Sequence, residues 1–161
     1  MTSHIPNIAV YVDVQNIYYT TRDTYGRPLN YRALMQHIRT KGNIVSAIAY
    51  AIAREDDKQR QFQDALRHMG FEVKLKPYIQ RSDGSAKGDW DVGITIDVMT
   101  VPGIVDTVVL LSGDGDFAIL LEKIHQDYGM RTEVYGVEAL TANALIQAAS
   151  VYNPITEDLL L

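Results

Sequence analysis

The sequence of 161 residues contains no cysteine. Disulfide bonds, zinc sites built from thiolates and thiol-based catalysis are therefore all excluded. A chain without cysteine also suits a reducing compartment, where disulfides rarely persist.

The sequence also lacks a long apolar run. No stretch approaches the ~20 apolar residues that a transmembrane helix needs. The first residues, MTSHIPNIAVYVD, have no basic region, and their apolar stretch ends in Asp13, so a signal peptide is not expected. We therefore expect a cytoplasmic protein with no membrane partner. Its length and its 47% of apolar residues fit a single domain over residues 1–161.

Basic residues are scarce in the second half of the chain. Residues 1–87 contain 13 Lys+Arg and 8 Asp+Glu, a net charge of +5, whereas residues 88–161 contain 2 and 12, a net charge of -10. The overall charge of -5 argues against non-specific coating of nucleic acid. The acidic half reflects either ordinary surface charge or acids that bound cations would offset.

Strand-like and helix-like segments alternate along the chain. Strands are predicted at 7–13, 43–53, 71–77, 105–112 and 131–137, mostly as continuous apolar runs typical of buried parallel strands. Helices are predicted at 31–41, from 56 or 57 to 68 or 69, and at 90–99, 117–128 and 141–150, with Asn30 and Asp56 or Asp57 as N-caps. Residues 81–88 are expected to form a mobile loop and the tail 152–161 to pack loosely. This alternation predicts an α/β domain with a mostly parallel sheet of five to six strands and helices on both faces.

Acids directly follow two of the predicted strands. Asp13 closes the first, and Asp114 and Asp116 follow the fourth within SGDGD. Ligands of open α/β sheets bind beyond the carboxyl ends of the strands. Asp13 and Asp116 can alternatively be helix caps, whereas Asp114 has no comparable structural role. Two carboxylates so close in sequence repel unless a proton or a cation lies between them, and oxygen-only ligands favour Mg²⁺ or Mn²⁺.

Further candidates lie near these acids in the predicted fold. Asn16 is about one helical turn beyond Asp13 and can hold a carboxylate or a water. Asp91, near the start of a helix, can point back toward the strand ends, whereas Asp97 lies roughly 240° around that helix and is a second-tier ligand or an ion-pair partner. Asp89 is expected to be a cap or a surface residue. Lys87 either contacts a phosphate or is an ordinary solvated lysine.

Other site types fit the sequence less well. The segment 113–118 matches the dinucleotide fingerprint G-x-G-x-x-A, but both acidic side chains within it would face a pyrophosphate, and it follows the fourth strand, not the first. No terminal glutamate completes an EF-hand loop. The 4 histidines are scattered without ligand spacing, and the sequence contains neither a P-loop nor a Ser-His-Asp arrangement.

Three motifs in order, YVDVQN, KGDWDVGITID and LLSGDGDF, resemble the NYN domain, in particular its bacterial LabA-like branch within the PIN-like nuclease superfamily. The later segments GMRTEVYGV and ALIQAASVYNPI also fit, so the resemblance covers about residues 8–152. It implies a Rossmann-like PIN fold with a metal-binding acidic pocket. The acidic positions of the family fall on Asp13, Asp91, Asp114 and Asp116, with Asp97 as a further acid and Asn16 as the asparagine beside the first acid.

The resemblance implies hydrolysis of RNA phosphodiester bonds, and an endoribonuclease that uses Mg²⁺ or Mn²⁺ is favoured. RNA, single-stranded or structured, is expected to contact Lys87, Arg81 and Arg54. Tyr18 and Tyr19 are expected either to stack on unpaired bases or to be packing residues. Two other functions stay open: a non-catalytic RNA-binding or regulatory adaptor that keeps the acidic pocket, and a small-molecule phosphohydrolase. A Toprim-like domain would need a glutamate where Asp13 stands. A domain of this size also allows a homodimer.

Overall fold

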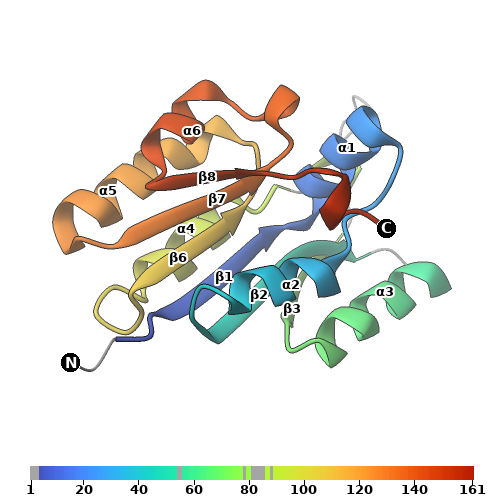
Figure 1. The fold of residues 1–161 in the computed structure, drawn as a ribbon. Coiled ribbons are helices and arrows are strands. Elements are labelled where there is room, and N and C mark those ends of the chain that lie inside the picture. Colours follow the sequence, from blue (N-terminus) through green and yellow to red (C-terminus); the bar gives the residue numbers. More distant parts are fainter. Residues whose placement is uncertain (1–3, 54–55, 78, 81–85, 88) are drawn as a thin grey trace.

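The computed structural model describes residues 4–53, 56–77, 79–80, 86–87 and 89–161 (Figure 1). For 79–80 and 86–87 it describes the backbone alone. Most of the predicted loop at 81–88 lies outside these residues, as do Arg54 and Arg81.

Six parallel strands form the sheet at the centre of the molecule (Figure 1). Their order across the sheet is β3-β2-β1-β6-β7-β8, and every neighbouring pair is parallel. The strands are β1 (Asn7–Asp13), β2 (Asn43–Ala53), β3 (Glu72–Pro77), β6 (Thr107–Leu111), β7 (Arg131–Gly136) and β8 (Val151–Pro154). Two short strands, β4 (Ile79–Gln80) and β5 (Ala86–Lys87), pair antiparallel outside this sheet. The predicted α/β class and parallel sheet are confirmed.

Helices cover both faces of the sheet, as the alternating pattern predicted. Helices α1 (Val14–Tyr25), α2 (Tyr31–Arg39) and α3 (Asp57–His68) contribute to the core on one face. Helices α4 (Asp91–Met99), α5 (Ala118–Tyr128) and α6 (Asn143–Ala148) contribute to the core on the other. The described part of the chain also contains three single-turn 3-10 helices: η1 (Gly115–Phe117), η2 (Glu138–Leu140) and η3 (Glu157–Leu159). Within the described ranges, none of these helices combines the length and the apolar character needed to cross a bilayer.

Local signals explain where several helices begin and which face they bury. The side chain of Asn30 accepts a hydrogen bond from the backbone N–H of Ala33 at 3.0 Å, and Asp56 caps α3 in the same way. A capping side chain satisfies a backbone donor that the first helical turn leaves unpaired. On α4, Ile94 and Val98 are fully buried, which confirms their predicted inward orientation.

The tail of the chain packs tightly, so the predicted loose packing of residues 152–161 was wrong. Strand β8 adds a sixth strand beside β7, with Val134 paired to Tyr152. Beyond it, Ile155 is fully buried and Leu160 is 5% exposed, both in the core under α1 and α2. The predicted helix at 141–150 was too long, because only residues 143–148 are α-helical.

The order of the strands reverses direction at β1. The chain runs outward from β1 to β2 and β3, then returns to place β6 on the other side of β1 and continues to β7 and β8. Helices therefore leave the carboxyl ends of β1 and β6 toward opposite faces, which opens a crevice between those ends. Val12 pairs with Leu111, so Asp13 and Ser112 are the next residues on the two strands at this crevice.

Candidate metal centre

Three carboxylates converge at the crevice between β1 and β6. Asp91 begins α4, whereas Asp114 and Asp116 lie just beyond β6. Each offers an oxygen, and these oxygens all lie within 4.8 Å of one another. Oxygens on opposite sides of a Mg²⁺ ion are about 4 Å apart, since each lies about 2.1 Å from the ion. The spacing of these carboxylates therefore suits a hard divalent cation.

Burial, together with the neighbouring carboxylates, makes the ionised form of Asp91 costly. Burial is the largest cause that raises its pKa to about 7, followed by a hydrogen bond shared with Asp114. The negative charges of Asp114, Asp89 and Asp13 raise it further. A carboxyl group that holds its proton because of neighbouring anions is one that a cation would deprotonate and stabilise.

Asp13 lies beside this group, at the buried end of β1. Burial raises its pKa to about 6, opposed by a hydrogen bond from the hydroxyl of Ser112. The charges of Asp114 and Asp89 also raise the pKa of Asp13. The backbone N–H of Asn16 lowers the pKa of Asp13, although the Asp13 side chain makes no capping hydrogen bond to α1. Asp13 is thus an acid held against the centre by β1, and its carboxylate is not among the three that come within 4.8 Å of one another.

Ser112 connects the two strand ends. Its hydroxyl donates to Asp13 Oδ2 at 3.0 Å and accepts from the backbone N–H of Asp114 at 3.1 Å. Asn16 holds the same loop, because its side-chain Oδ1 accepts a hydrogen bond from the backbone N–H of Gly113 at 2.8 Å. The predicted asparagine therefore holds the loop that carries two acids. Sequence reasoning missed Ser112, although a hydroxyl at the end of an otherwise apolar buried strand was a usable signal.

The SGDGD loop differs from its prediction in which acid caps the following helix. The carboxylate of Asp114 accepts from the backbone N–H of Asp116 at 2.9 Å and caps η1. Two expectations were therefore wrong: Asp116 is not the cap, and Asp114 does have a structural role. Gly113 is needed for close packing: an added Cβ would lie 2.6 Å from the backbone oxygen of Leu140. A Cβ at Gly115 would lie 2.8 Å from the Cβ of Ala142. Both glycines thus serve contacts within the protein, which removes the reason to interpret them as a dinucleotide fingerprint.

Trp90 fixes the start of α4 and thereby the position of Asp91. Its indole N–H donates to the backbone oxygen of Ala51 at 2.9 Å, at the carboxyl end of β2. The Nζ atom of Lys76 lies 4.5 Å from the centre of the indole ring. An added Cβ at Gly93 would lie only 2.6 Å from the ring, so α4 needs a glycine there. The sequence analysis did not single out Trp90, the one tryptophan of the chain, although it directly precedes a candidate acid.

Asp97 belongs to a different set of contacts. It accepts hydrogen bonds from the Tyr50 hydroxyl and from Lys74 Nζ, each at 2.7 Å. Burial acts to raise its pKa, but these hydrogen bonds and the charge of Lys74 outweigh burial and hold the pKa below its ordinary value. Asp97 therefore has its own cationic partner, as the ion-pair alternative described.

The predicted RNA-contacting residues are only partly described. Tyr18 and Tyr19 are 53% and 38% exposed on α1, and the guanidinium of Arg22 lies 5.6 Å and 4.8 Å from their ring centres. Lys87 belongs to β5, but its side chain is outside the described part of the structure. No histidine takes part in the acidic group among the described residues.

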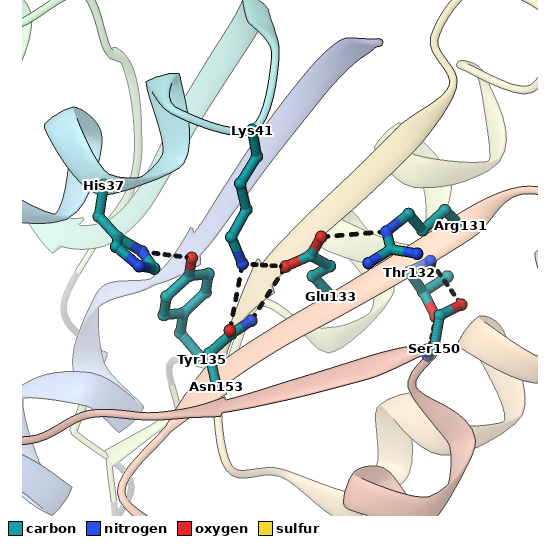
Figure 2. Close-up of polar contacts among 8 residues, drawn as sticks. All are labelled: His37, Lys41, Arg131, Thr132, Glu133, Tyr135, Ser150 and Asn153. Atoms are coloured by element: carbon teal, nitrogen blue, oxygen red, sulfur yellow. Dashed lines mark hydrogen bonds and ion pairs between the residues drawn. The ribbon is translucent and has the colours of Figure 1, made fainter.

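A second polar cluster lies away from the acids and joins α2 to β7 and β8 (Figure 2). Glu133, only 3% exposed, pairs with Lys41 and Arg131 and accepts a hydrogen bond from Asn153. Burial tends to raise the pKa of Glu133, but its partners hold the pKa below its ordinary value. The negative charge of Glu133 is compensated by two cations within the protein, which indicates a structural role.

The sheet is parallel, helices cover both of its faces, and the acids gather where the strand order reverses. These features define a Rossmann-like domain with an acidic centre. Residues 7–156 match the family model of the NYN domain, and the chain belongs to this family, within the PIN-like nuclease superfamily. The chain is 29% identical over 156 residues to the low amplitude and bright protein LabA of Synechococcus elongatus. The similarity covers 90% of this chain and 81% of that protein.

A solved structure is also similar over the whole chain. It is a protein of unknown function from Vibrio parahaemolyticus, 52% identical, with a TM-score of 0.93. The similarity covers 100% of this chain and 99% of that one.

Proposed function

We propose that this protein is a divalent-metal-dependent ribonuclease that hydrolyses RNA phosphodiester bonds at the acidic centre. The observation that supports this most is the meeting of Asp91, Asp114 and Asp116 within 4.8 Å, beside the buried Asp13. The choice of RNA as substrate rests on membership of the NYN domain family.

The donor set fits Mg²⁺ or Mn²⁺, because all three side chains offer carboxylate oxygens and the described part of the centre has no sulfur or imidazole ligand. Asp91, Asp114 and Asp116 would hold the ion. When bound, such an ion would supply Lewis acidity toward the phosphate and toward an attacking water. It would also turn a centre that repels phosphate into one that attracts it.

The chain's own residues have separate tasks in this proposal. Asp13, with a pKa of about 6, is mostly ionised near neutral pH and can accept a proton from the attacking water. The water oxygen forms a bond to phosphorus in line with the bond to the 3′ oxygen. That bond breaks, and the leaving 3′ oxygen takes a proton from solvent. The products carry a 5′-phosphate and a 3′-hydroxyl. Ser112 and Asn16 are positioning residues, since they hold Asp13 and the loop of Asp114 in place.

The experiment is a cleavage assay with end-labelled single-stranded and structured RNA, in Mn²⁺, Mg²⁺ or EDTA. We expect cleavage with metal and none in EDTA. Asp114→Asn should reduce the rate by more than about 100-fold, since even outer-shell partners of a metal are worth about 10- to 100-fold. It should stay folded, because an asparagine oxygen can still cap η1.

Asp64→Asn is the matched control, since Asp64 is an exposed α3 residue whose partner is Arg67. Its cleavage rate should equal that of the wild type. Undiminished cleavage by Asp114→Asn would refute the site. Tight RNA binding without cleavage in any metal would identify a non-catalytic adaptor instead.

A further inference from the structure

An apolar groove of 520 Å³ lies on the face of the sheet that α1, α2 and α3 cover. Its volume is within the range of about 300–1,000 Å³ that is typical of small-ligand sites. Tyr18 from α1, Tyr31 from α2 and Phe62 from α3 contribute aromatic rings to its lining. The rings of Tyr31 and Phe62 meet edge to face, with centres 5.6 Å apart.

The groove begins next to the acidic centre. Val14 and Gln15 line it and directly follow Asp13 along the chain. On the neighbouring strand, Ala51 and Ile52 line it and directly follow Tyr50, the residue paired with Asp13. The groove and the acids therefore lie at the same, carboxyl edge of the sheet, and the charge of Asp13 acts on Tyr31, which lines the groove.

The charges around the groove are opposite to those of the acidic centre. None of the described side chains that line the groove is an aspartate or a glutamate, whereas Arg32 is among them. Arg22 stacks against Tyr18 and Tyr19 at the rim, but its charge is paired with Asp23, so Arg32 supplies the positive charge of the groove. Such a site suits a ligand with a flat uncharged ring and a nearby anion.

Polar side chains are few in the groove and lie between the apolar ones. The amides of Gln15 and Gln59 are among the lining residues, whereas the amide oxygen of Asn30, which also lines the groove, caps α2. Amides can pair with the donors and acceptors on the edge of a nucleobase, while aromatic rings stack on its faces.

We propose that the groove binds an unstacked base of single-stranded RNA whose backbone passes the acidic centre. This inference rests on the proposed function, because it takes the substrate of that centre to be RNA. In a duplex, each base is stacked on its neighbours and paired with a base of the opposite strand. It therefore cannot enter a groove of this kind without being extruded from the helix. The groove therefore selects unpaired RNA.

The test measures binding, so that it does not depend on cleavage. The Asp114→Asn variant, which should neither hold the ion nor cleave, is titrated without divalent metal, so that differences in affinity report on the groove. Its ligands are a fluorescent single-stranded RNA, the same RNA carrying abasic positions, and a duplex. In this background, Ala65→Phe places a ring in the groove, because Ala65 is an exposed α3 residue that lines it. The matched control is Ala144→Phe, an exposed residue of α6 on the opposite face.

We expect Ala65→Phe to weaken binding of single-stranded RNA by about 5- to 150-fold, the value of one stacked base. Ala144→Phe should bind like its parent. Abasic RNA should bind weakly and equally to all three proteins. Tyr18→Leu, which keeps the groove open but removes an aromatic ring, should weaken binding in the same direction.

Equal affinity of Ala65→Phe and Ala144→Phe for single-stranded RNA would overturn the inference, and so would a preference for the duplex. If Ala65→Phe instead dissociates a dimer seen by sedimentation, the occupant is a second copy of this chain and the inference is equally overturned. The proposed function fails separately: groove-dependent binding without cleavage by the wild type refutes the nuclease alone. Cleavage that Ala65→Phe leaves unchanged refutes the groove alone.

Discussion

Ser112 donates its hydroxyl hydrogen to the carboxylate of Asp13 at 3.0 Å, across the ends of two adjacent strands. The same hydroxyl accepts from the backbone N–H of Asp114. One small side chain therefore links the buried acid of β1 to the loop that carries the acids of β6. This link requires the two strands to be neighbours, which the strand order provides.

Ser112→Ala should weaken the centre without unfolding the protein. The substitution removes the hydrogen bond that lowers the pKa of Asp13, so that pKa should rise above its value of about 6. We expect Mn²⁺ affinity to fall by about 10- to 100-fold, as for other residues that orient a metal ligand. The pH at which cleavage is half-maximal should move upward. Ser150→Ala, which removes a hydroxyl bonded to Thr132, is the control and should change neither quantity.

The metal-free protein should become less stable as pH rises from about pH 5 to about pH 8. The folded-state pKa values of Asp91 and Asp13 are about 7 and about 6, above the ordinary 3.8. The folded state therefore holds more protons than the unfolded state in this window, and the stability they contribute is lost as pH rises through the folded pKa values.

Thermal unfolding in EDTA measures this effect. The midpoint should fall across the window, Mn²⁺ should restore it most at the upper end, and Asp91→Asn should flatten the dependence. Carboxyls with lowered pKa values, such as Asp97, act in the opposite direction but only at lower pH, where they titrate. A midpoint that rises across the window in EDTA would contradict the raised pKa values of Asp91 and Asp13.

Gly93→Ala should lower metal affinity even though alanine favours the α4 helix more than glycine does. Alanine favours a helix over glycine by about 1 kcal/mol. The added Cβ would however lie 2.6 Å from the Trp90 ring, so the indole must move and Asp91 with it. We expect a shift of tryptophan emission and a loss of Mn²⁺ affinity of about tenfold or more. Val92→Ala, at a position 70% exposed, is the control. An unshifted spectrum with unchanged affinity would contradict the positioning role of Trp90.

The sequence was most informative where a strand is long and buried. The bounds predicted for β1 and β2 agree with the structure, because continuous apolar runs flanked by polar residues leave little ambiguity. Strand β8 escaped prediction, since it has four residues, includes Pro154 and lies at the sheet edge. Short edge strands carry a weak pattern, and only tertiary packing reveals them.

The centre was predictable only in part. Asp114 and Asp116 stand out because they follow a buried strand within a glycine-rich loop. That Asp91 meets them depends on the hydrogen bond from Trp90 to Ala51 and on the place of α4 over the sheet. Such contacts join residues far apart in the chain, so periodicity and spacing cannot reveal them.

Asp97→Asn should affect stability and leave the metal centre intact. Asp97 is bonded to Tyr50 and Lys74, and the substitution removes the charge that pairs with this lysine. We expect a loss of unfolding free energy of about 1–3 kcal/mol, the cost of weakening a charged hydrogen bond in a half-buried site. Mn²⁺ affinity should stay close to that of the wild type. A loss of affinity as large as that of Asp91→Asn would place Asp97 among the ligands.

Binding of a divalent cation by Asp91, Asp114 and Asp116 can be measured by titration with Mn²⁺. The titration is followed through the fluorescence of Trp90, which adjoins Asp91, and by calorimetry. We expect saturable binding to the wild type and to Asp64→Asn, and no saturable binding to Asp114→Asn. Absence of saturable binding to the wild type, or equal affinity in Asp114→Asn, would contradict this expectation.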